Sequence, residues 1–407
     1  MIVATATCAA AATEAAAQDR TRVLNNQLQL GDVIAGERLN VVDATEQVTV
    51  SNAAQGNSVS GAAQGVDIEL QSQQSLHGDV RGTTDMSFGG DTDGVVNVTT
   101  QARGNYLAAA GYGANVHVES DQTVGATSVQ ATNTLDDDQA RLLGGAYVNS
   151  TAIANTAALG GEGARVEGVL IQNSGATVRA HNYAATQYIP AEAEFTAQAL
   201  ANAVAVNSES DSDSGSSQNL VARQRSTGAI VEADVSANAG NAWQLAARAN
   251  AGGNQAVLAN QGGSQLVTTD QSNLSAIRAA AIATSYDYGS ITAHARGAAN
   301  EASIGNNDVY VEIDNAQFNS GGVSVTADVT ATNGYDAYVG ADAAGNVVTG
   351  YACADCEATM LATNSQVNEG DVSAQARTEI RGSNRAVITG ANAVGNSATF
   401  YVSRPGQ

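Results

Sequence analysis

Closely spaced aspartates are the first residues in this sequence with the chemistry to bind a ligand. Asp91 and Asp93 alternate in GGDTDG, and Asp211 and Asp213 alternate in a serine-rich stretch. Carboxylates at this spacing supply the hard oxygen ligands that Ca²⁺ prefers. A calcium β-roll needs a repeated GGxGxD motif and an EF-hand needs a full loop with a distal glutamate, and the sequence contains neither. We interpret these aspartates, and the run 136–138, as solvated acidic turns, with occasional calcium binding as the alternative.

The four histidines, His77, His117, His181 and His294, form no ligand pair at positions i and i+4. The sequence also contains no GxSxG, HExxH or phosphate-loop motif. Polysaccharide lyases and hydrolases on β-helices use clustered carboxylates, or a Lys or Arg base, on one side of the coil. This chain has no lysine, and its arginines are scattered. We therefore predict no catalytic residue, no metal centre and no cofactor.

Cys353 and Cys356 form a single CxxC pair in YACADCEATM. A zinc ribbon needs four ligands, and a thioredoxin-like site needs the pair to open a helix, whereas this pair follows a predicted strand. The sequence therefore predicts a local disulfide formed in an oxidising compartment, with free thiols as the alternative.

Tyr335, Tyr338 and Tyr351 lie close together in sequence. Exposed tyrosines at such spacing can form a platform on which sugar rings stack, because the ring is apolar and the hydroxyl is polar. We favour a packing role at a corner or at the edge of the core, and keep sugar stacking as the alternative.

The elements that would position these residues are short strands. In the stretch 321–332, GGVSVTADVTAT, small apolar residues alternate with polar ones, which is the period of a strand with one buried face. The same alternation recurs along the chain. Alanine and valine dominate the apolar residues and only 4% of residues are aromatic, so we expect a thin core between closely spaced strands.

Two markers recur with a spacing near 47 residues, and together they indicate an internal repeat. The first is a glycine turn preceded by a glutamine, with Ser275 replacing the glycine once. The second is an asparagine that follows small residues. Both residue types tolerate the backbone conformations of tight corners. The glycines are Gly31, Gly78, Gly125, Gly175, Gly228, Gly322 and Gly370, and the asparagines are Asn57, Asn105, Asn149, Asn207, Asn254, Asn300, Asn346 and Asn396.

The markers interleave at 21 and 26 residues, and each interval resembles the circumference of one solenoid coil. We therefore predict an all-β, elongated parallel β-solenoid (β-helix) of about eight repeats with two coils per repeat. Roughly sixteen rungs would give a rod of about 75 Å. Asparagines at equivalent positions are expected to stack in hydrogen-bonded ladders. The exposed ends are expected to be capped or paired with a partner, including another copy.

The predicted domain boundaries follow from the same pattern. Residues 1–17 resemble the remnant of a secretory signal peptide, and residues 404–407 form a tail. Residues 18–403 form one solenoid domain. The segments 183–194 and 208–217 interrupt the repeat, so we expect them to be insertions that leave the stack.

The formal net charge of −23 excludes several function classes. Nucleic-acid binding needs clustered cations, and docking on anionic lipid does as well. An acidic surface keeps a repetitive β protein soluble and discourages lateral association. The composition favours a secreted, solvated surface.

Several sequence motifs resemble the holdfast-anchor protein D family of stalked alphaproteobacteria. They include the opening NNQLQLGDV (25–33), the segments AAQGNSVS, QARGNYLA and NAVGNSATFYV, and the QxNxG turns. The likeness extends over nearly the whole mature chain and lies in repeats, so it carries no individual functional residue. Curlin subunits share Gln, Asn and Gly at corners, but their repeats are shorter and more regular.

The resemblance implies a non-catalytic protein at the cell surface, associated with the outer membrane. It implies export through an outer-membrane lipoprotein pore, and a role in fastening the polysaccharide holdfast to the envelope beside a curlin-like partner. Two alternatives stay open at this point. One is a secreted β-helix enzyme acting on carbohydrate, and the other is a curlin-like, fibre-forming adhesin subunit.

Overall fold

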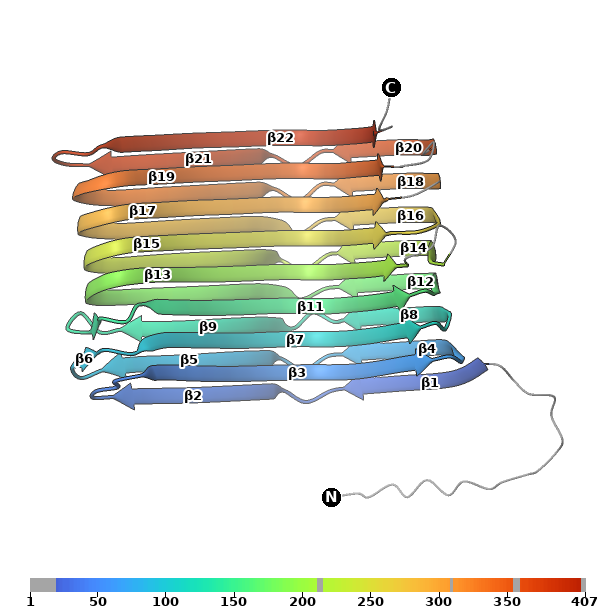
Figure 1. Cartoon of the computed structure of the whole chain (residues 1–407), viewed down its shortest axis with the longest axis horizontal. Coiled ribbons are helices and arrows are strands. Elements are labelled where there is room, and N and C mark those ends of the chain that lie inside the picture. Colours follow the sequence, from blue (N-terminus) through green and yellow to red (C-terminus); the bar gives the residue numbers. More distant parts are fainter. Residues whose placement is uncertain (1–19, 211–214, 308–309, 354–358, 404–407) are drawn as a thin grey trace, which may run out of the picture.

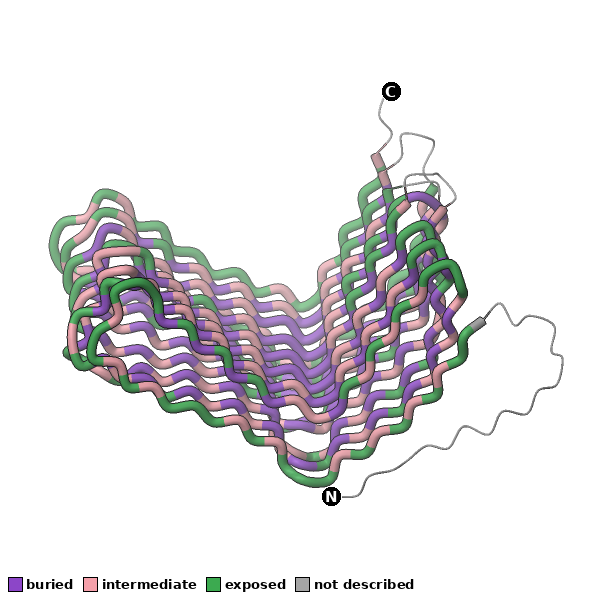
Figure 2. Tube along the Cα trace, turned by 60° about the horizontal axis from the view of Figure 1, so that its bottom comes forward, coloured by how far each residue is buried: buried purple, intermediate pink, exposed green. Residues whose placement is uncertain are grey.

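The chain is an all-β, parallel solenoid, which confirms the predicted fold class (Figure 1). The structure is a computed structural model and describes residues 20–210, 215–307, 310–353 and 359–403. Each lap has a V-shaped cross-section with a short arm and a long arm that meet at a vertex (Figure 2). The first run of a lap crosses the short arm to the vertex, and the second follows the long arm to its tip. The third, the return run, crosses the vertex to the end of the short arm.

Eight first runs form the short-arm sheet. They are β1 (Arg20–Gln29), β4 (Asp67–Leu76), β8 (Val116–Val124), β12 (Arg165–Ser174), β14 (Ser217–Ser226), β16 (Ser264–Asn273), β18 (Tyr310–Asn319) and β20 (Thr359–Asn368).

The second and return runs form the other sheet. In the first three laps and the last lap they are separate strands, and in laps four to seven they fuse into long strands that bend at the tip of the long arm. The separate strands are β2 (Val33–Val41), β3 (Gln47–Gln64), β5 (Val80–Phe88), β7 (Val95–Tyr112), β9 (Ser128–Asp136), β11 (Ala146–Glu162), β21 (Val372–Ile380) and β22 (Ala386–Ser403). The fused strands are β13 (Thr177–Glu209), β15 (Ile230–Asn260), β17 (Ala276–Asn306) and β19 (Val323–Cys353), and the short pieces β6 (Asp91–Thr92) and β10 (Arg141–Leu142) lie at the tip of the long arm.

Each arm encloses its own hydrophobic core, visible as the buried layer of Figure 2. The long-arm core is built largely from alanine and valine, as predicted. In β19, Val323, Val325, Ala327 and Val329 are buried while the residues between them face out. Small side chains of this kind allow the second run and the return run of one lap to pack closely against each other.

One lap takes a whole repeat, so the prediction of two coils per repeat is wrong. β1 pairs with β4 in a register that places Gln27 opposite Gln74, and β16 pairs with β18 in a register that places Thr268 opposite Asp314. The 21- and 26-residue intervals between markers are two parts of one lap, because the chain passes the vertex twice. Eight rungs span about 35 Å, half the predicted length.

Two amide ladders run along the vertex through all eight laps. In the first, each asparagine Nδ2 donates to Oδ1 of the next asparagine at 2.7–2.9 Å, through Asn57, Asn105, Asn155, Asn202, Asn254, Asn300, Asn346 and Asn396. In the second, each glutamine Nε2 donates to Oε1 of the preceding glutamine at 2.7–2.9 Å, through Gln27, Gln74, Gln122, Gln172, Gln224, Gln271, Gln317 and Gln366. The same amides also donate to backbone carbonyls across the vertex, for example Asn105 to Thr123 and Gln74 to Tyr106. Buried amides that satisfy one another fix the register of successive laps.

The ladder corrects two sequence assignments. Asn155 and Asn202 occupy the ladder, and Asn149 and Asn207 do not. The segment 183–194 is not an insertion, because it lies within β13 and pairs with β15. The irregularity there is a local register shift between Ile189 and Glu192. Residues 211–214 of the second predicted insertion lie outside the described residues.

The predicted corner glycines lie between each first run and the following second run. Positive φ does not explain them, since the glycines with positive φ in the described residues lie at other positions, such as Gly65 and Gly113. At three corners the reason is close approach of the neighbouring lap. A Cβ atom at Gly78 would lie 2.1 Å from the carbonyl oxygen of Gly31, and one at Gly370 would lie 2.0 Å from that of Gly321. Gly228 is similarly constrained, whereas Gly322 is not, because the tight residue of that corner is Gly321.

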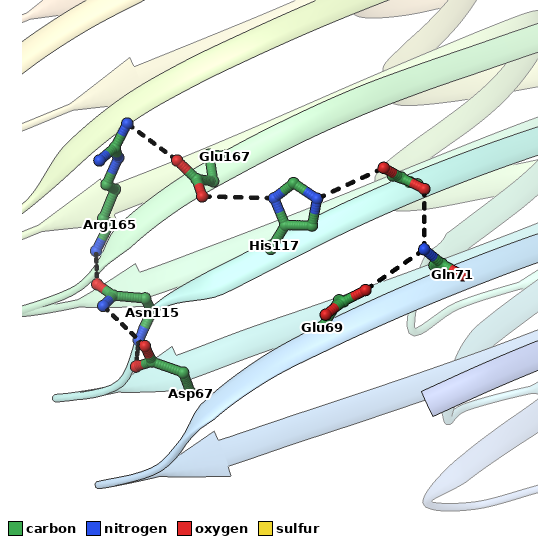
Figure 3. A network of polar contacts seen from close by, with 8 residues as sticks. Asp67, Glu69, Gln71, Asn115, His117, Arg165 and Glu167 are labelled. Atoms are coloured by element: carbon green, nitrogen blue, oxygen red, sulfur yellow. Dashed lines mark hydrogen bonds and ion pairs between the residues drawn. The ribbon is translucent and has the colours of Figure 1, made fainter. Parts of the chain in front are cut away.

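Charged and polar side chains on the outer face of the short arm join neighbouring laps (Figure 3). His117 lies between two carboxylates, 3.7 Å from Glu119 and 3.4 Å from Glu167. Glu167 also pairs with Arg165 at 2.9 Å. Exposed pairs of this kind contribute about 0–1 kcal/mol each, so they tune the stability of the stack but do not determine it.

Candidate functional site: an aromatic groove

The fused strands β13, β15, β17 and β19 bend at the tip of the long arm (Figure 1). A groove crosses these bends. Its cavity volume is about 540 Å³. Five successive laps contribute to it, so the groove runs along the solenoid axis and not along a strand. The lining residues are Tyr188, Pro190, Asn241, Ala242, Trp243, Asp287, Tyr288, Gly289, Asn333, Gly334, Tyr335 and Ser383.

Two exposed rings form the ridge of the groove. Trp243, the only tryptophan of the chain, is 55% exposed, and Tyr335, two laps further on, is 54% exposed. Their rings meet edge to face, with centroids 6.2 Å apart and an interplanar angle of 74°. A second hollow of about 390 Å³ lies against the same pair. Both rings are therefore accessible on more than one side.

Glycines in the adjacent lap make room for these rings. A Cβ atom at Gly289 would lie 2.9 Å from the Trp243 ring, and one at Gly334 would lie 2.5 Å from the Tyr288 ring. Because a ring on one lap rests over a glycine of the next, its orientation is fixed by packing before any ligand arrives.

The lining of the groove carries polar groups in register. Asn241, Asp287 and Asn333 occupy equivalent positions of three laps. The backbone N–H of Asp287 donates to Oδ1 of Asn241 at 3.2 Å, and Nδ2 of Asn333 donates to Oδ1 of Asp287 at 3.2 Å. This column presents amide and carboxylate groups at the spacing of the laps.

The charges beside the ridge are paired. Nε of Arg385 donates to Oδ1 of Asp336 at 2.9 Å, and the guanidinium carbon lies 5.9 Å from the centre of the Tyr335 ring. The hydrogen bond from Arg385 lowers the pKa of the Asp336 carboxyl. Burial raises the pKa of the Tyr288 hydroxyl, with a smaller contribution from the charge of Asp336. At neutral pH an ionised Asp336 therefore lies beside the groove, and a neutral Tyr288 lies within it.

The three tyrosines singled out in the sequence do not form one platform. Tyr335 lines the groove, and Tyr338 lies beyond its lining. Tyr351 lies elsewhere and stacks on Tyr401 with centroids 5.8 Å apart. Sequence reasoning missed Trp243 and Tyr288, because the groove draws its residues from different repeats. Aligning the repeats would have placed Trp243, Gly289 and Tyr335 in one column.

The histidines and acidic residues occupy separate places. His181 lies 3.2 Å from Asp234 and His294 lies 3.2 Å from Asp342, so each contacts a carboxylate of the next lap. Asp91 pairs with Arg141 at 3.0 Å. No group of three or more His, Cys, Asp or Glu residues in the described part of the chain is arranged to hold a metal ion.

Two sequence predictions fall partly outside the described residues. Cys353 is half-buried at the end of β19, but Cys356 lies in the segment 354–358, so the predicted disulfide stays a prediction. Asp211 and Asp213 lie in the segment 211–214. A helix with the length and hydropathy of a membrane span is absent from the residues that the structure describes.

The fold and the groove define a class: a parallel β-solenoid repeat protein with an aromatic groove on its side. Residues 42–323 match the family model of holdfast attachment protein D (HfaD), and the chain belongs to this family. Comparisons with curated proteins and with solved structures gave no match. Membership implies a role in holdfast attachment and a location at the cell envelope or surface.

Proposed function

We propose that this protein is a non-catalytic, load-bearing element that holds the polysaccharide holdfast to the outer envelope. The observation that carries the proposal is the pair of amide ladders, which continue without interruption through all eight laps. Each step of the stack is joined by parallel backbone pairing and by buried side-chain hydrogen bonds. Force applied at one lap is therefore shared with its neighbours, which suits an anchor better than a single deep pocket does.

The chemistry of the groove argues against the enzymatic alternative. Glycosidases need one carboxyl group whose pKa is raised, so that it is protonated and acts as a general acid. Asp336 has the opposite property, because its hydrogen bond with Arg385 lowers its pKa. Asp287 accepts a hydrogen bond from Nδ2 of Asn333, so its carboxylate is engaged in the polar column of the groove. The groove therefore suits binding without cleavage.

The ends of the solenoid bear on the fibre-forming alternative. Each ladder runs in one direction, because within it every donor faces the same end of the stack. The last lap therefore presents groups that complement those of the first lap, and head-to-tail stacking would continue both ladders. Glu37 opposes such stacking, because it lies opposite the buried Thr84 in the register of β2 and β5 and is exposed on the first lap, where a stacked copy would bury its charge. A charge at such a position of an edge strand discourages end-to-end association. We propose that self-association is weak.

The remaining parts of the proposal rest on the family. They are export through an outer-membrane lipoprotein pore and assembly beside a curlin-like partner adhesin. The last lap, β20 to β22, offers unpaired strand edges and partly buried core residues such as Val372 and Ala374, which suit pairing with another β chain.

Deletion of the gene tests the function. Cells that lack the protein are expected to synthesise a chemically normal holdfast and to shed it under flow, and a plasmid copy is expected to restore retention. A holdfast that stays on the deletion strain but has altered chain length would overturn the anchoring role and support an enzyme.

A further inference from the structure

We propose that the aromatic groove binds a polysaccharide chain lying along the solenoid axis, and that this chain is uncharged or amine-bearing. The inference rests on the proposed function, because it takes the holdfast polysaccharide to be the ligand. It goes further by assigning the contact to one surface, the long-arm tip of laps four to eight, and by restricting the chemistry of the sugar.

The distribution of aromatic residues is the first reason. The chain has one tryptophan, twelve tyrosines and four phenylalanines among 407 residues. In so aromatic-poor a chain, the tryptophan and three tyrosines line one groove, and Trp243 and Tyr335 are more than half exposed. Exposed rings that are gathered in one groove indicate an interaction site, whereas single exposed rings do not. Aromatic rings suit carbohydrate because the C–H face of a pyranose is apolar while its edge carries hydroxyl groups.

The second reason is that the rings are held in place. Trp243 rests over Gly289 and Tyr288 rests over Gly334, and the hydroxyl of Tyr288 donates a hydrogen bond to Oδ1 of Asn384. The site therefore loses little conformational entropy when a ligand binds, which is what a weakly interacting ligand such as a sugar requires.

The third reason is the match between the groove and an extended chain. The lining runs from Tyr188 in the fourth lap to Ser383 in the eighth, and four steps of about 4.8 Å give a contact length of about 19 Å. The polar column of Asn241, Asp287 and Asn333 repeats at each of three laps. A polymer of similar sugars meets such a repeating set of donors and acceptors along its length, whereas a single small molecule would use only part of it.

The charges decide the class of sugar. The groove contains the carboxylate of Asp287, and the neighbouring hollow contains that of Asp336, which is already paired with the guanidinium group of Arg385. The whole chain carries a formal charge of −23. A polyuronate would be repelled both by the groove and by the field of the protein, whereas hydroxyl, acetamido or amino groups would be accepted.

Intrinsic fluorescence gives a direct readout, since the only tryptophan lies in the groove. Soluble fragments of purified holdfast polysaccharide are titrated into the intact protein. We expect saturable quenching or a spectral shift of Trp243, and polygalacturonate should not compete. Fragments that leave the emission unchanged would overturn the site, and competition by polygalacturonate would overturn the charge rule.

Variants measured by calorimetric titration locate the contact. Trp243→Ala and Tyr335→Ala should each weaken binding at least about tenfold, as expected for aromatic hot spots. Trp243→Phe should retain most of the affinity. Tyr112→Ala is the matched control, because Tyr112 is an exposed tyrosine (51%) at the end of the short arm, and it should change affinity less than about twofold. Circular dichroism and thermal melting confirm that each variant is folded. Equal loss in the control would overturn the assignment.

Retention of the holdfast separates this inference from the proposed function. If cells with the gene deletion shed their holdfast, and cells with a chromosomal Trp243→Ala substitution shed it as well, then the anchoring role and the groove assignment are both supported. If the deletion sheds and a Trp243→Ala, Tyr335→Ala double variant keeps a normal holdfast, the groove is wrong and the anchoring role survives. If the deletion retains its holdfast, the anchoring role itself fails.

Discussion

Removing one amide from the middle of the asparagine ladder tests whether the ladder stabilises the stack. Asn202 is fully buried and makes three hydrogen bonds. Its Oδ1 accepts from Asn155 at 2.9 Å, and its Nδ2 donates to Oδ1 of Asn254 at 2.8 Å and to the carbonyl oxygen of Arg225 at 3.0 Å. Asn202→Ala removes all three without changing the strand.

The expected cost follows from the groups left without a partner. One N–H of Asn155 and the Oδ1 of Asn254 stay buried and lose their ladder bond, and each of these two orphaned groups costs about 1–3 kcal/mol. The carbonyl oxygen of Arg225 also loses its bond, but that contact is only partly buried, so it adds little to the cost. The total is about 2–6 kcal/mol. Asn396 is the matched control, because it ends the ladder, is exposed and accepts one ladder bond, from Asn346. Water can replace that bond, so Asn396→Ala should cost only about 0.5–1.5 kcal/mol.

Guanidinium denaturation followed by circular dichroism is the assay. For Asn202→Ala we expect the midpoint to fall by about 0.5–1 M, given guanidinium slopes of several kcal/mol per molar. A lesion in the middle of a linear array also uncouples the two halves, so the transition should broaden. Midpoints are compared because two-state behaviour is not assured for a long array. A midpoint shift no larger than that of Asn396→Ala would refute the structural role of the ladder.

Two further predictions concern charge. The hydrogen bond that His181 donates to the Asp234 carboxylate raises the pKa of His181, so the pair stabilises the fold fully below the unfolded pKa of His and loses its effect as pH rises through the folded pKa. The parent should therefore melt at a higher temperature than the Asp234→Asn variant, and this difference should be larger at about pH 6 than at about pH 9. A difference that grows as the pH rises would contradict the stabilising role of the His181–Asp234 pair. Removing the charge of Glu37 by the Glu37→Ala substitution should increase head-to-tail assembly. Sedimentation velocity should show a sedimentation coefficient that rises with protein concentration. Unchanged sedimentation, with the parent at equal concentration as control, would show that Glu37 does not limit stacking.

The repeat and the core were readable from the sequence because both depend on local pattern. A period near 47 residues follows from the glycine turns, and strand alternation identifies buried residues such as Val323 and Val325. The number of laps per repeat was not readable. Gly31 and Asn57 both lie near the vertex but on different runs of the same lap, and spacing alone does not distinguish two passes of one lap from two laps.

The residues of the asparagine ladder and of the groove could not be predicted from the sequence for a second reason. Asn149 was mistaken for the ladder residue because asparagine is common in this chain, and only pairing between laps identifies Asn155. The groove residues Trp243 and Tyr335 come from different repeats. The position between them in the same column is a glycine, Gly289, so no local motif identifies the aromatic pair. They lie close together because the chain winds, and in this region successive laps place residues 46 positions apart side by side, for example Gln244 and Ser290.

Disulfide trapping tests the central claim, that each repeat completes one lap, most directly. Thr268 and Asp314 face each other on β16 and β18, and neighbouring parallel strands place Cα atoms at about 4.8 Å, within reach of a disulfide. With the native cysteines replaced by serine, the Thr268→Cys, Asp314→Cys pair should cross-link rapidly. The pair Thr268→Cys, Thr292→Cys, half a repeat apart, should stay reduced. Cross-linking of the half-repeat pair in place of the full-repeat pair would contradict the account.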